Sequence, residues 1–122
     1  MASLNRVQLI GRLGADPKKT ETSKGTLIST FSIAVDRKWK FGGEVKSSTD
    51  WFNIVAFGKL ADVCNKYLKK GKLVYIEGRL KTEKYEKDGE VKYFTRVSAT
   101  SMQLLEKKAT EEIDAEAEEE LE

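Results

Sequence analysis

The sequence predicts an all-β fold, a barrel of five strands with one helix inserted between the third and the fourth strand. Three observations lead to this prediction. Five segments have the residue pattern of strands, one segment repeats with the period of a helix, and glycines interrupt strands where a barrel has to bend. The chain has 122 residues, enough for one such domain and a short terminal segment.

The five strands are separated by turns and polar links. They are expected at residues 5–13, 27–35, 49–57, 73–85 and 91–105. In the first strand Val7 and Leu9 share a face, and Gly11 stands where a barrel strand bends or bulges. The second strand places its apolar side chains on one parity, which is typical of a half-buried strand. Polar residues 18–26 are expected to link these two strands as a loop.

The third strand carries apolar side chains on both of its faces. One parity holds Trp51 and Phe57, and the other holds Phe52, Ile54 and Ala56. Only one of these faces can point to the core. The pattern therefore leaves two alternatives, because Trp51 and Phe57 either face solvent or belong to the core.

An amphipathic helix is expected to follow from Leu60. Its apolar stripe consists of Leu60, Val63, Cys64, Tyr67 and Leu68. We assign Tyr67 to the buried side, and we interpret Cys64 as a small buried apolar residue rather than a nucleophile. Gly71 is expected to cap the helix after two lysines, since glycine adopts the left-handed conformation and lysines favour the negative end of the helix dipole.

The last two strands are expected to form a hairpin. Gly78 should bend the first of them, and Asp88-Gly89 supplies the positive φ angles of a type I′ turn. The hairpin should project as a long arm with residues 86–90 at its tip. A helix between the third and fourth of five bent strands is the arrangement of the oligonucleotide-binding (OB) barrel, a Greek-key fold whose open face binds single strands or oligosaccharides.

Charge is distributed unevenly along the chain. All 22 lysines and arginines lie between Arg6 and Lys108 with 12 of the 20 acidic residues, which gives this stretch a net charge of +10. The other 8 acidic residues lie between Glu111 and Glu122. A basic body attracts polyanions, whereas a terminal block of like charges stays solvated. We expect a single-strand-binding OB domain over 1–108 and a disordered acidic tail over 109–122.

The composition argues against catalysis. With no histidine and one cysteine, the chain lacks a Cys/His metal cluster, a nucleophile–histidine pair and an internal disulfide. We therefore expect no enzymatic activity, no cofactor and no metal. No apolar run approaches the ~20 residues of a membrane span, and no secretion signal precedes the first strand. A cytoplasmic (nucleoid-associated) protein without membrane contact is expected.

Aromatic side chains and lysines are interleaved in the segments that we expect at the surface. In chain order they are Trp39 with Lys40, Trp51 and Phe57 with Lys59, and Tyr85 with Lys81 and Lys84. Trp39 and Trp51 flank a predicted loop rich in glycine and lysine, which is a poor setting for a core residue, so Trp39 is expected to be exposed. Rings of this kind stack on bases of any sequence at ~1–3 kcal/mol per base, and lysines contact phosphates. The pattern favours single-stranded DNA binding without sequence readout, although Tyr85 alone fits equally well as a ring packed across its hairpin.

Three blocks of sequence resemble the bacterial-type single-stranded-DNA-binding proteins. They are residues 5–17 (NRVQLIGRLGADP), residues 51–61 (WFNIVAFGKLA) and residues 67–80 (YLKKGKLVYIEGRL). Their order and spacing match the family over most of residues 5–105. The resemblance implies an OB fold, a homotetramer with a dimer as the alternative, no enzymatic activity, and a role in DNA replication, recombination and repair.

The resemblance also implies roles for particular residues. The ring positions that match Trp39, Trp51, Phe57 and Tyr85 stack on bases, so Trp51 and Phe57 should face the DNA. Lys59, Lys70 and Lys84 should lie along the phosphate path, to which the interleaving adds Lys40 and Lys81.

Two features depart from the family pattern. The acidic residues begin at Glu111 without the usual Gly-, Pro- or Gln-rich linker, and the chain ends in EELE without the apolar tip that recruits replication and repair proteins. Recruitment of such partners through the tail is therefore in question. In addition, Glu83 stands beside Lys84 where the family favours a basic residue, which should weaken the phosphate path there.

Two other roles stay open as alternatives. The long hairpin and the divergent tail also fit an accessory OB protein of the primosome type, which mainly bridges protein partners. An OB-fold nuclease would need acidic metal ligands in one pocket. Asp36, Asp50 and Asp62 lie on separate predicted elements, which argues against a nuclease.

Overall fold

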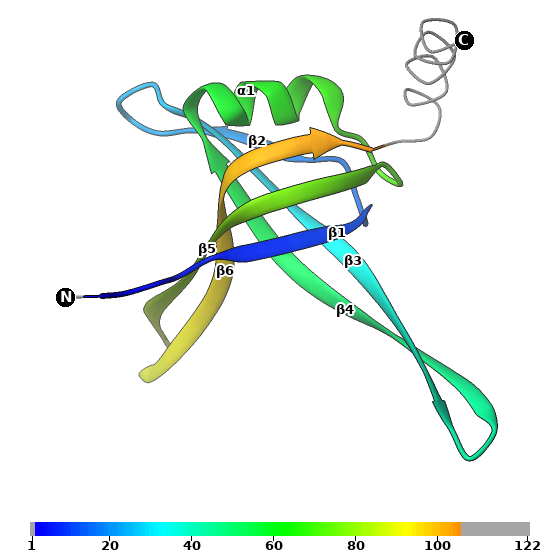
Figure 1. Cartoon of the computed structure of the whole chain (residues 1–122). Coiled ribbons are helices and arrows are strands. Elements are labelled where there is room, and N and C mark those ends of the chain that lie inside the picture. The colour runs from blue at the N-terminus through cyan, green and yellow to red at the C-terminus, as the bar shows by residue number, and fades with distance from the viewer. Residues whose placement is uncertain (1, 106–122) are drawn as a thin grey trace, which may run out of the picture.

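The computed structural model describes residues 2–105, in which the chain forms six strands and one helix (Figure 1). The strands are β1 (Val7–Leu13), β2 (Lys18–Glu21), β3 (Leu27–Phe41), β4 (Glu44–Phe57), β5 (Leu73–Lys87) and β6 (Glu90–Leu104). The helix α1 (Gly58–Tyr67) lies between β4 and β5, as predicted. The acidic segment 109–122 lies outside the described residues.

The five long strands close into a barrel. The order within the sheet is β1-β5-β6-β4-β3-β2, and β1 also pairs with β3, which closes the sheet on itself. All neighbours are antiparallel except β4 and β6, which run parallel and pair only at Ile54–Val97 and Val55–Ser98. The short strand β2 falls in the stretch predicted as a loop, because its four residues are polar and exposed and show no alternation.

Two glycines allow the strands to approach where the barrel closes. A Cβ at Gly11 would meet the carbonyl of Ala34 on β3, and a Cβ at Gly78 would meet the carbonyl of Ser98 on β6. The register between β5 and β6 shifts at Gly78, so the predicted bend there is confirmed as a bulge. The register between β1 and β5 continues through Gly11 without a shift, so that glycine serves close approach rather than a bulge.

The core lies inside the barrel and is closed at one end by α1 (Figure 1). Its largest fully buried side chains are Ile33, Ile54, Val74, Ile76 and Val97. Cys64 of α1 is completely buried among them, and burial raises the pKa of its thiol to about 11. The interpretation of Cys64 as a buried apolar residue is therefore confirmed, since a protonated thiol is a poor nucleophile.

Two predictions about the helix are wrong. Tyr67 is 60% exposed rather than buried, because the buried side of α1 is formed by Ala61 and Cys64, continued by Leu68 after its last turn. The helix ends at Tyr67, where the N–H of Leu68 bonds to the carbonyl of Cys64. Gly71 (φ 87°) lies in the turn after the helix and donates its N–H to Leu13 over 2.9 Å, so it is not the helix cap.

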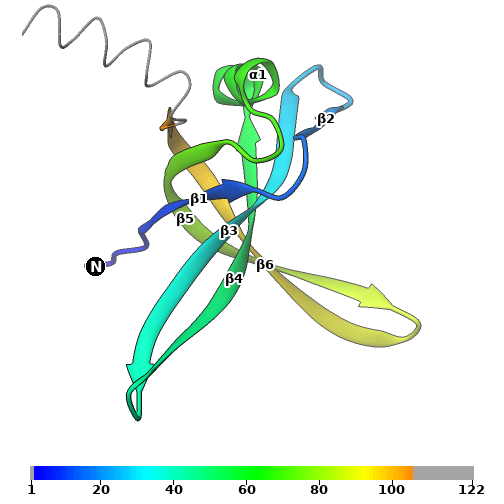
Figure 2. The ribbon, with the colours of Figure 1, turned by 90° about the vertical axis from the view of Figure 1, so that its right-hand side faces the viewer.

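Two hairpins project from the barrel as arms that diverge from each other (Figure 2). We call residues 36–49 the β3–β4 arm and residues 81–96 the β5–β6 arm. Both have two-residue tips with positive φ at each position, Gly42-Gly43 and Asp88-Gly89, as a type I′ turn requires. The β5–β6 arm confirms the predicted hairpin. The β3–β4 arm occupies a stretch expected as a loop.

Candidate nucleic-acid interface

The outer face of β4 presents two aromatic rings to solvent. Trp51 is 59% and Phe57 is 46% exposed, whereas Ile54 and Ala56 are buried and Phe52 packs against the core. Successive side chains of a strand point to opposite faces, so the two rings share the face that points away from the barrel interior. Of the two alternatives for the third strand, the structure shows the one in which Trp51 and Phe57 face outwards.

Trp51 rests on the backbone of Gly14. A Cβ at Gly14 would lie 2.5 Å from Cζ3 and 2.9 Å from Cη2 of the indole. The N–H of Gly14 donates to the carbonyl of Ser32 on β3 over 3.1 Å, which holds this turn against the strand beside Trp51. The indole therefore has a fixed support on one side while most of its surface stays open. No local sequence pattern connects Gly14 with Trp51, so the sequence does not predict this contact.

Trp39 lies on the β3–β4 arm, on the face opposite that of Trp51. Trp51 is paired with Ala34 and Trp39 with Lys46, so strand alternation puts the two indoles on opposite sides of the ribbon. Trp39 is 39% exposed, and the guanidinium of Arg37 lies 5.0 Å from its ring centroid. This cation–π contact orients the ring on the arm.

Phe41 is a further ring on the same side of the arm. It is exposed and follows Arg37 and Trp39 at alternate positions. Phe41 is not among the rings predicted from the sequence, although its position beside the Gly42-Gly43 tip indicates that it cannot enter a core.

Tyr85 lies on the β5–β6 arm opposite Lys92. Its ring is 45% exposed, and Lys84, Glu86 and Val91 surround a shallow hollow beside it. The four predicted rings therefore form no single cluster. Trp51 and Phe57 lie on the barrel, and Trp39 and Tyr85 lie on separate arms (Figure 2).

The five predicted phosphate contacts are all exposed lysines. They are Lys40 on the β3–β4 arm, Lys59 in the first turn of α1, Lys70 in the turn after α1, and Lys81 and Lys84 on the β5–β6 arm. Within residues 2–105 no ion pair joins any of them to an acidic side chain. The backbone N–H of Lys70 bonds to Oδ1 of Asp16 over 2.8 Å, which fixes that turn. Their charges are therefore available to an external anion.

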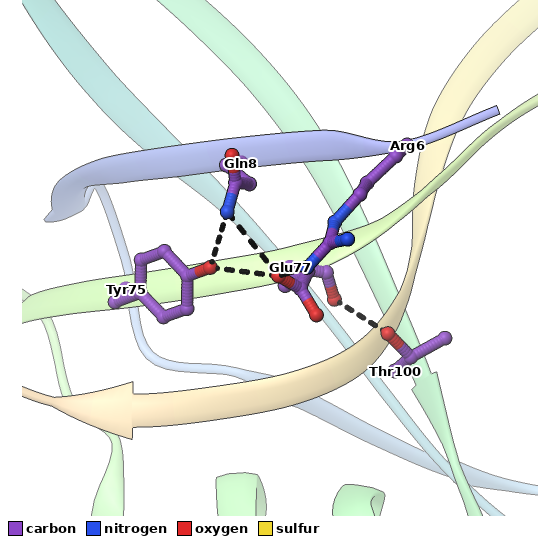
Figure 3. A network of polar contacts seen from close by, with 5 residues as sticks. All are labelled: Arg6, Gln8, Tyr75, Glu77 and Thr100. Atoms are coloured by element: carbon purple, nitrogen blue, oxygen red, sulfur yellow. Dashed lines mark hydrogen bonds and ion pairs between the residues drawn. The ribbon is translucent and has the colours of Figure 1, made fainter. Parts of the chain in front are cut away.

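A polar network connects β1 and β5 on the outside of the barrel (Figure 3). The Glu77 carboxylate accepts hydrogen bonds from Arg6 (2.6 Å), Tyr75 (2.9 Å) and Gln8 (3.3 Å), and Thr100 of β6 donates to its backbone carbonyl (3.1 Å). The hydrogen bond from Arg6, followed by that from Tyr75, lowers the pKa of Glu77, and the same pairing raises the pKa of Arg6. Because the network joins residues of three strands that are distant in the sequence, no sequence motif predicts it.

Two of the three acidic residues considered for a nuclease site take other partners. Asp36 accepts a hydrogen bond from Thr49 across the β3–β4 arm at 2.8 Å, and Asp62 pairs with Lys66 on α1 at 3.1 Å. Across residues 2–105 there is no group of three or more Cys, Asp or Glu side chains placed to hold a metal ion. The described part of the chain also contains no helix long and apolar enough to cross a membrane.

Curated proteins with similar sequences are named as single-stranded DNA-binding proteins. The chain is 48% identical over 105 residues to single-stranded DNA-binding protein 1 of Chlorobaculum tepidum, covering 84% of this chain and 65% of the relative. It is 42% identical over 111 residues to single-stranded DNA-binding protein 1 of Xylella fastidiosa, covering 88% and 82% of the two chains. The chain thus spans a little under two thirds of the Chlorobaculum relative.

A solved structure and a protein family also match. A structure described as the Plasmodium falciparum SSB complex with ssDNA has a TM-score of 0.82 and 34% sequence identity, and the match covers 87% of this chain and 98% of that one. The agreement confirms the predicted OB fold. The family described as the single-strand binding protein family matches residues 4–105, which contain the barrel, both arms and every ring described above. This chain belongs to the single-strand binding protein family.

Proposed function

We propose that this protein binds single-stranded DNA without strong sequence preference, and so protects and organises it during replication, recombination and repair. The observation that carries the proposal is the pair of outward rings, Trp51 and Phe57, on the face of an OB barrel. Family membership and the likeness to a complex with ssDNA support it. It is a binding role, and we propose no catalytic step.

In this proposal the aromatic rings bind the bases of the DNA strand. Trp51 and Phe57 lie on one strand about 20 Å apart, at ~3.3 Å per residue, so they take different bases of the same DNA strand. We assign Trp39 and Tyr85 to further bases along the two arms. Every base has a π-face, so the rings do not select sequence.

Exposed lysines beside the rings provide the electrostatic part of the affinity. We assign the phosphate contacts to Lys40, Lys59, Lys70, Lys81 and Lys84. Each contact releases counterions from the DNA, so binding should weaken as salt concentration rises.

A titration with oligo-dT tests the proposal. Tryptophan emission should fall as DNA is added at low salt, because Trp39 and Trp51 stack on bases, and added salt should restore it. Emission that stays unchanged at micromolar protein would refute the proposal. Equal affinity for duplex DNA, together with a dimer in solution, would instead favour an accessory role of the primosome type.

We also propose that the protein is a homotetramer, with a dimer as the alternative. The edge of β1 from Val7 to Ile10 has no strand partner opposite β5 within the described chain, and Ile10 is an exposed apolar side chain on this strand. An open edge and exposed apolar groups favour association between copies. Sedimentation equilibrium at several concentrations should give the mass of four chains; the mass of one chain throughout would refute self-association.

The last proposals concern the localisation of the protein, its division into two segments and its protein partners. We propose a cytoplasmic protein that acts at the nucleoid, with an OB domain over 1–108 and an acidic segment over 109–122. Contacts with replication and repair proteins through that segment would depend on charge, since it lacks an apolar tip. Capture of purified replication proteins by the full chain, but not by a chain that ends at residue 110, would support this route.

A further inference from the structure

The two arms separate at one point of the barrel and leave a hollow there. Parallel strands β4 and β6 are in register only at Ile54–Val97 and Val55–Ser98. Before these positions β4 continues into the β3–β4 arm and β6 into the β5–β6 arm, and the arms diverge (Figure 2). The hollow between β3, β4 and β6 measures about 310 Å³, at the small end of the ~300–1,000 Å³ typical of ligand sites.

The side chains that line this hollow combine an aromatic ring, a cation and neutral polar groups. We call it the fork site and define it by Ser32, Asn53, Phe94 and Arg96. Phe94 is partly exposed, and the Arg96 guanidinium lies 5.0 Å from the centroid of its ring. A ring, a guanidinium, an amide and a hydroxyl are the groups that recognise a nucleotide through its base and its oxygen acceptors.

Arg96 has donor capacity that the protein does not use. One of its terminal nitrogens lies 3.2 Å from Oε2 of Glu83, but its Nε is buried and has no hydrogen-bond partner among the described residues. A buried donor without an acceptor is unfavourable, so an acceptor that reaches this nitrogen when a ligand binds would be held favourably. Glu83 is the acidic residue that departs from the family pattern, and its carboxylate competes with any such ligand for Arg96.

The fork site lies on the path between the two barrel rings. Asn53 is exposed on the same face of β4 as Trp51 and Phe57 and stands between them in the strand. A second hollow, lined in part by Trp51, shares Asn53 and Arg96 with the fork site. A DNA strand that stacks on both Trp51 and Phe57 therefore crosses Asn53 and the mouth of this hollow.

We propose that the fork site holds one nucleotide of the bound strand, with its base against Phe94 and with Arg96 donating to an oxygen acceptor. Asn53 and Ser32 supply neutral hydrogen bonds without fixing the base identity. The inference rests on the proposed binding of single-stranded DNA, and it adds contacts from β6, a strand that carries none of the rings assigned above. Glu83 weakens the site by holding one side of Arg96.

The first experiment measures oligo-dT affinity for Arg96→Met and Phe94→Leu. Lys24→Met is the control for charge, because Lys24 is exposed in the turn between β2 and β3 and loses one positive charge as Arg96 does. We expect each fork-site variant to bind about tenfold more weakly than this control, Arg96→Met because it loses a charge-assisted contact and Phe94→Leu because it loses stacking. Trp51→Ala serves as the reference for loss of stacking.

The second experiment uses Glu83, whose replacement leaves the core untouched. Glu83→Gln should tighten binding, and the gain should vanish in the Arg96→Met background. Glu86→Gln, on the opposite face of β5, removes the same charge and should give an equal gain in both backgrounds. The NMR signal of the Arg96 Nε–H should also shift when oligo-dT is added to the folded wild-type protein.

The outcomes separate this inference from the proposed function. If Trp51→Ala weakens binding while the fork-site variants match Lys24→Met, the fork site is refuted and the proposed function stands. An equal gain from Glu83→Gln in both backgrounds, or an Arg96 signal that oligo-dT does not move, refutes the site as well. Failure of the wild-type protein to bind oligo-dT at all would instead refute the proposed function.

Discussion

The barrel and the arms both expose aromatic rings, but they support them differently. The indole of Trp51 rests on the Gly14 backbone, on a strand that is paired with β3 along its length. Trp39 and Tyr85 lie on two-stranded ribbons, where Trp39 is held by the Arg37 guanidinium and Tyr85 faces Lys92. The barrel therefore supports the Trp51 ring with backbone atoms, whereas the arm supports the Trp39 ring with a side chain that has rotamer freedom of its own.

This difference has an energetic consequence. Immobilising a side chain at an interface costs ~0.5–1.5 kcal/mol, and a ring that is already held avoids most of that cost. Stacking contributes ~1–3 kcal/mol per base. We expect Trp51, which rests on backbone atoms, near the upper end of that range and the arm rings near the lower end.

The largest effect should come from removing the barrel ring. Trp51→Ala should weaken binding by ~2–3 kcal/mol, which is roughly 30- to 150-fold, for oligo-dT and oligo-dC alike. Fluorescence anisotropy of labelled oligonucleotides measures it, and Trp51→Phe is the control that keeps a ring. A loss confined to one base sequence would contradict stacking as the source of affinity.

Removing the support of that ring should come next. The added methyl group of Gly14→Ala would overlap the indole, so Trp51 must move although it remains present. We expect about tenfold weaker binding, an effect that disappears in the Trp51→Ala background because the two positions act as one unit. Additive losses in the double variant would show that Gly14 acts independently of the ring.

The arm rings should matter less. Trp39→Ala and Tyr85→Ala should each cost ~1 kcal/mol, or about fivefold, and their effects should add because the two residues lie on separate arms. The same anisotropy assay measures them. If either loss exceeds that of Trp51→Ala, support by backbone atoms does not decide how much a ring contributes to the affinity.

The sequence predicts the barrel strands better than it predicts the arms. The barrel strands share one core, and their residue pattern predicts them. The Asp88-Gly89 turn predicts the β5–β6 arm. The sequence predicts a loop where the β3–β4 arm lies, because a ribbon with both faces in solvent needs no apolar alternation and the apolar residues near its Gly42-Gly43 tip, Phe41 and Val45, are themselves exposed. Strand identity is visible in a sequence where one face is buried.

Residue environments were harder to predict than strands. The exposure of Tyr67 was missed because Ala61, a small residue without a strong pattern signal, takes its place on the buried side of α1. Helical spacing alone does not decide between two adjacent stripes. The contact of Gly14 with Trp51 joins distant parts of the chain, so only the closed barrel reveals it.

Acid should weaken the polar network around Glu77, which joins β1 to β5 on the barrel. Arg6 and Tyr75 lower the pKa of Glu77 below its ordinary value of about 4.5, so the folded state favours the charged form. That stability is fully present above the ordinary pKa and is lost as the pH falls through the lowered value. We expect wild type to have a higher midpoint of thermal unfolding than Glu77→Gln at pH 7. Measured down to pH 2, this difference in midpoint should shrink below about pH 4.5. If the difference in midpoint stays constant with pH, the charge of Glu77 is not the source of the stability that the variant loses.

The smallest effect should come from the acidic segment. Its 8 acidic residues can compete with DNA for the basic body when salt is low, so deleting residues 111–122 should tighten binding a few-fold there. Screening should abolish the gain at high salt. Because this competition is for charge and not for rings, the fold-loss on Trp51→Ala should be the same with and without the segment. Unchanged affinity at low salt would remove the competition, whereas a smaller loss on Trp51→Ala in the shortened chain would mean that the segment acts through the barrel ring itself.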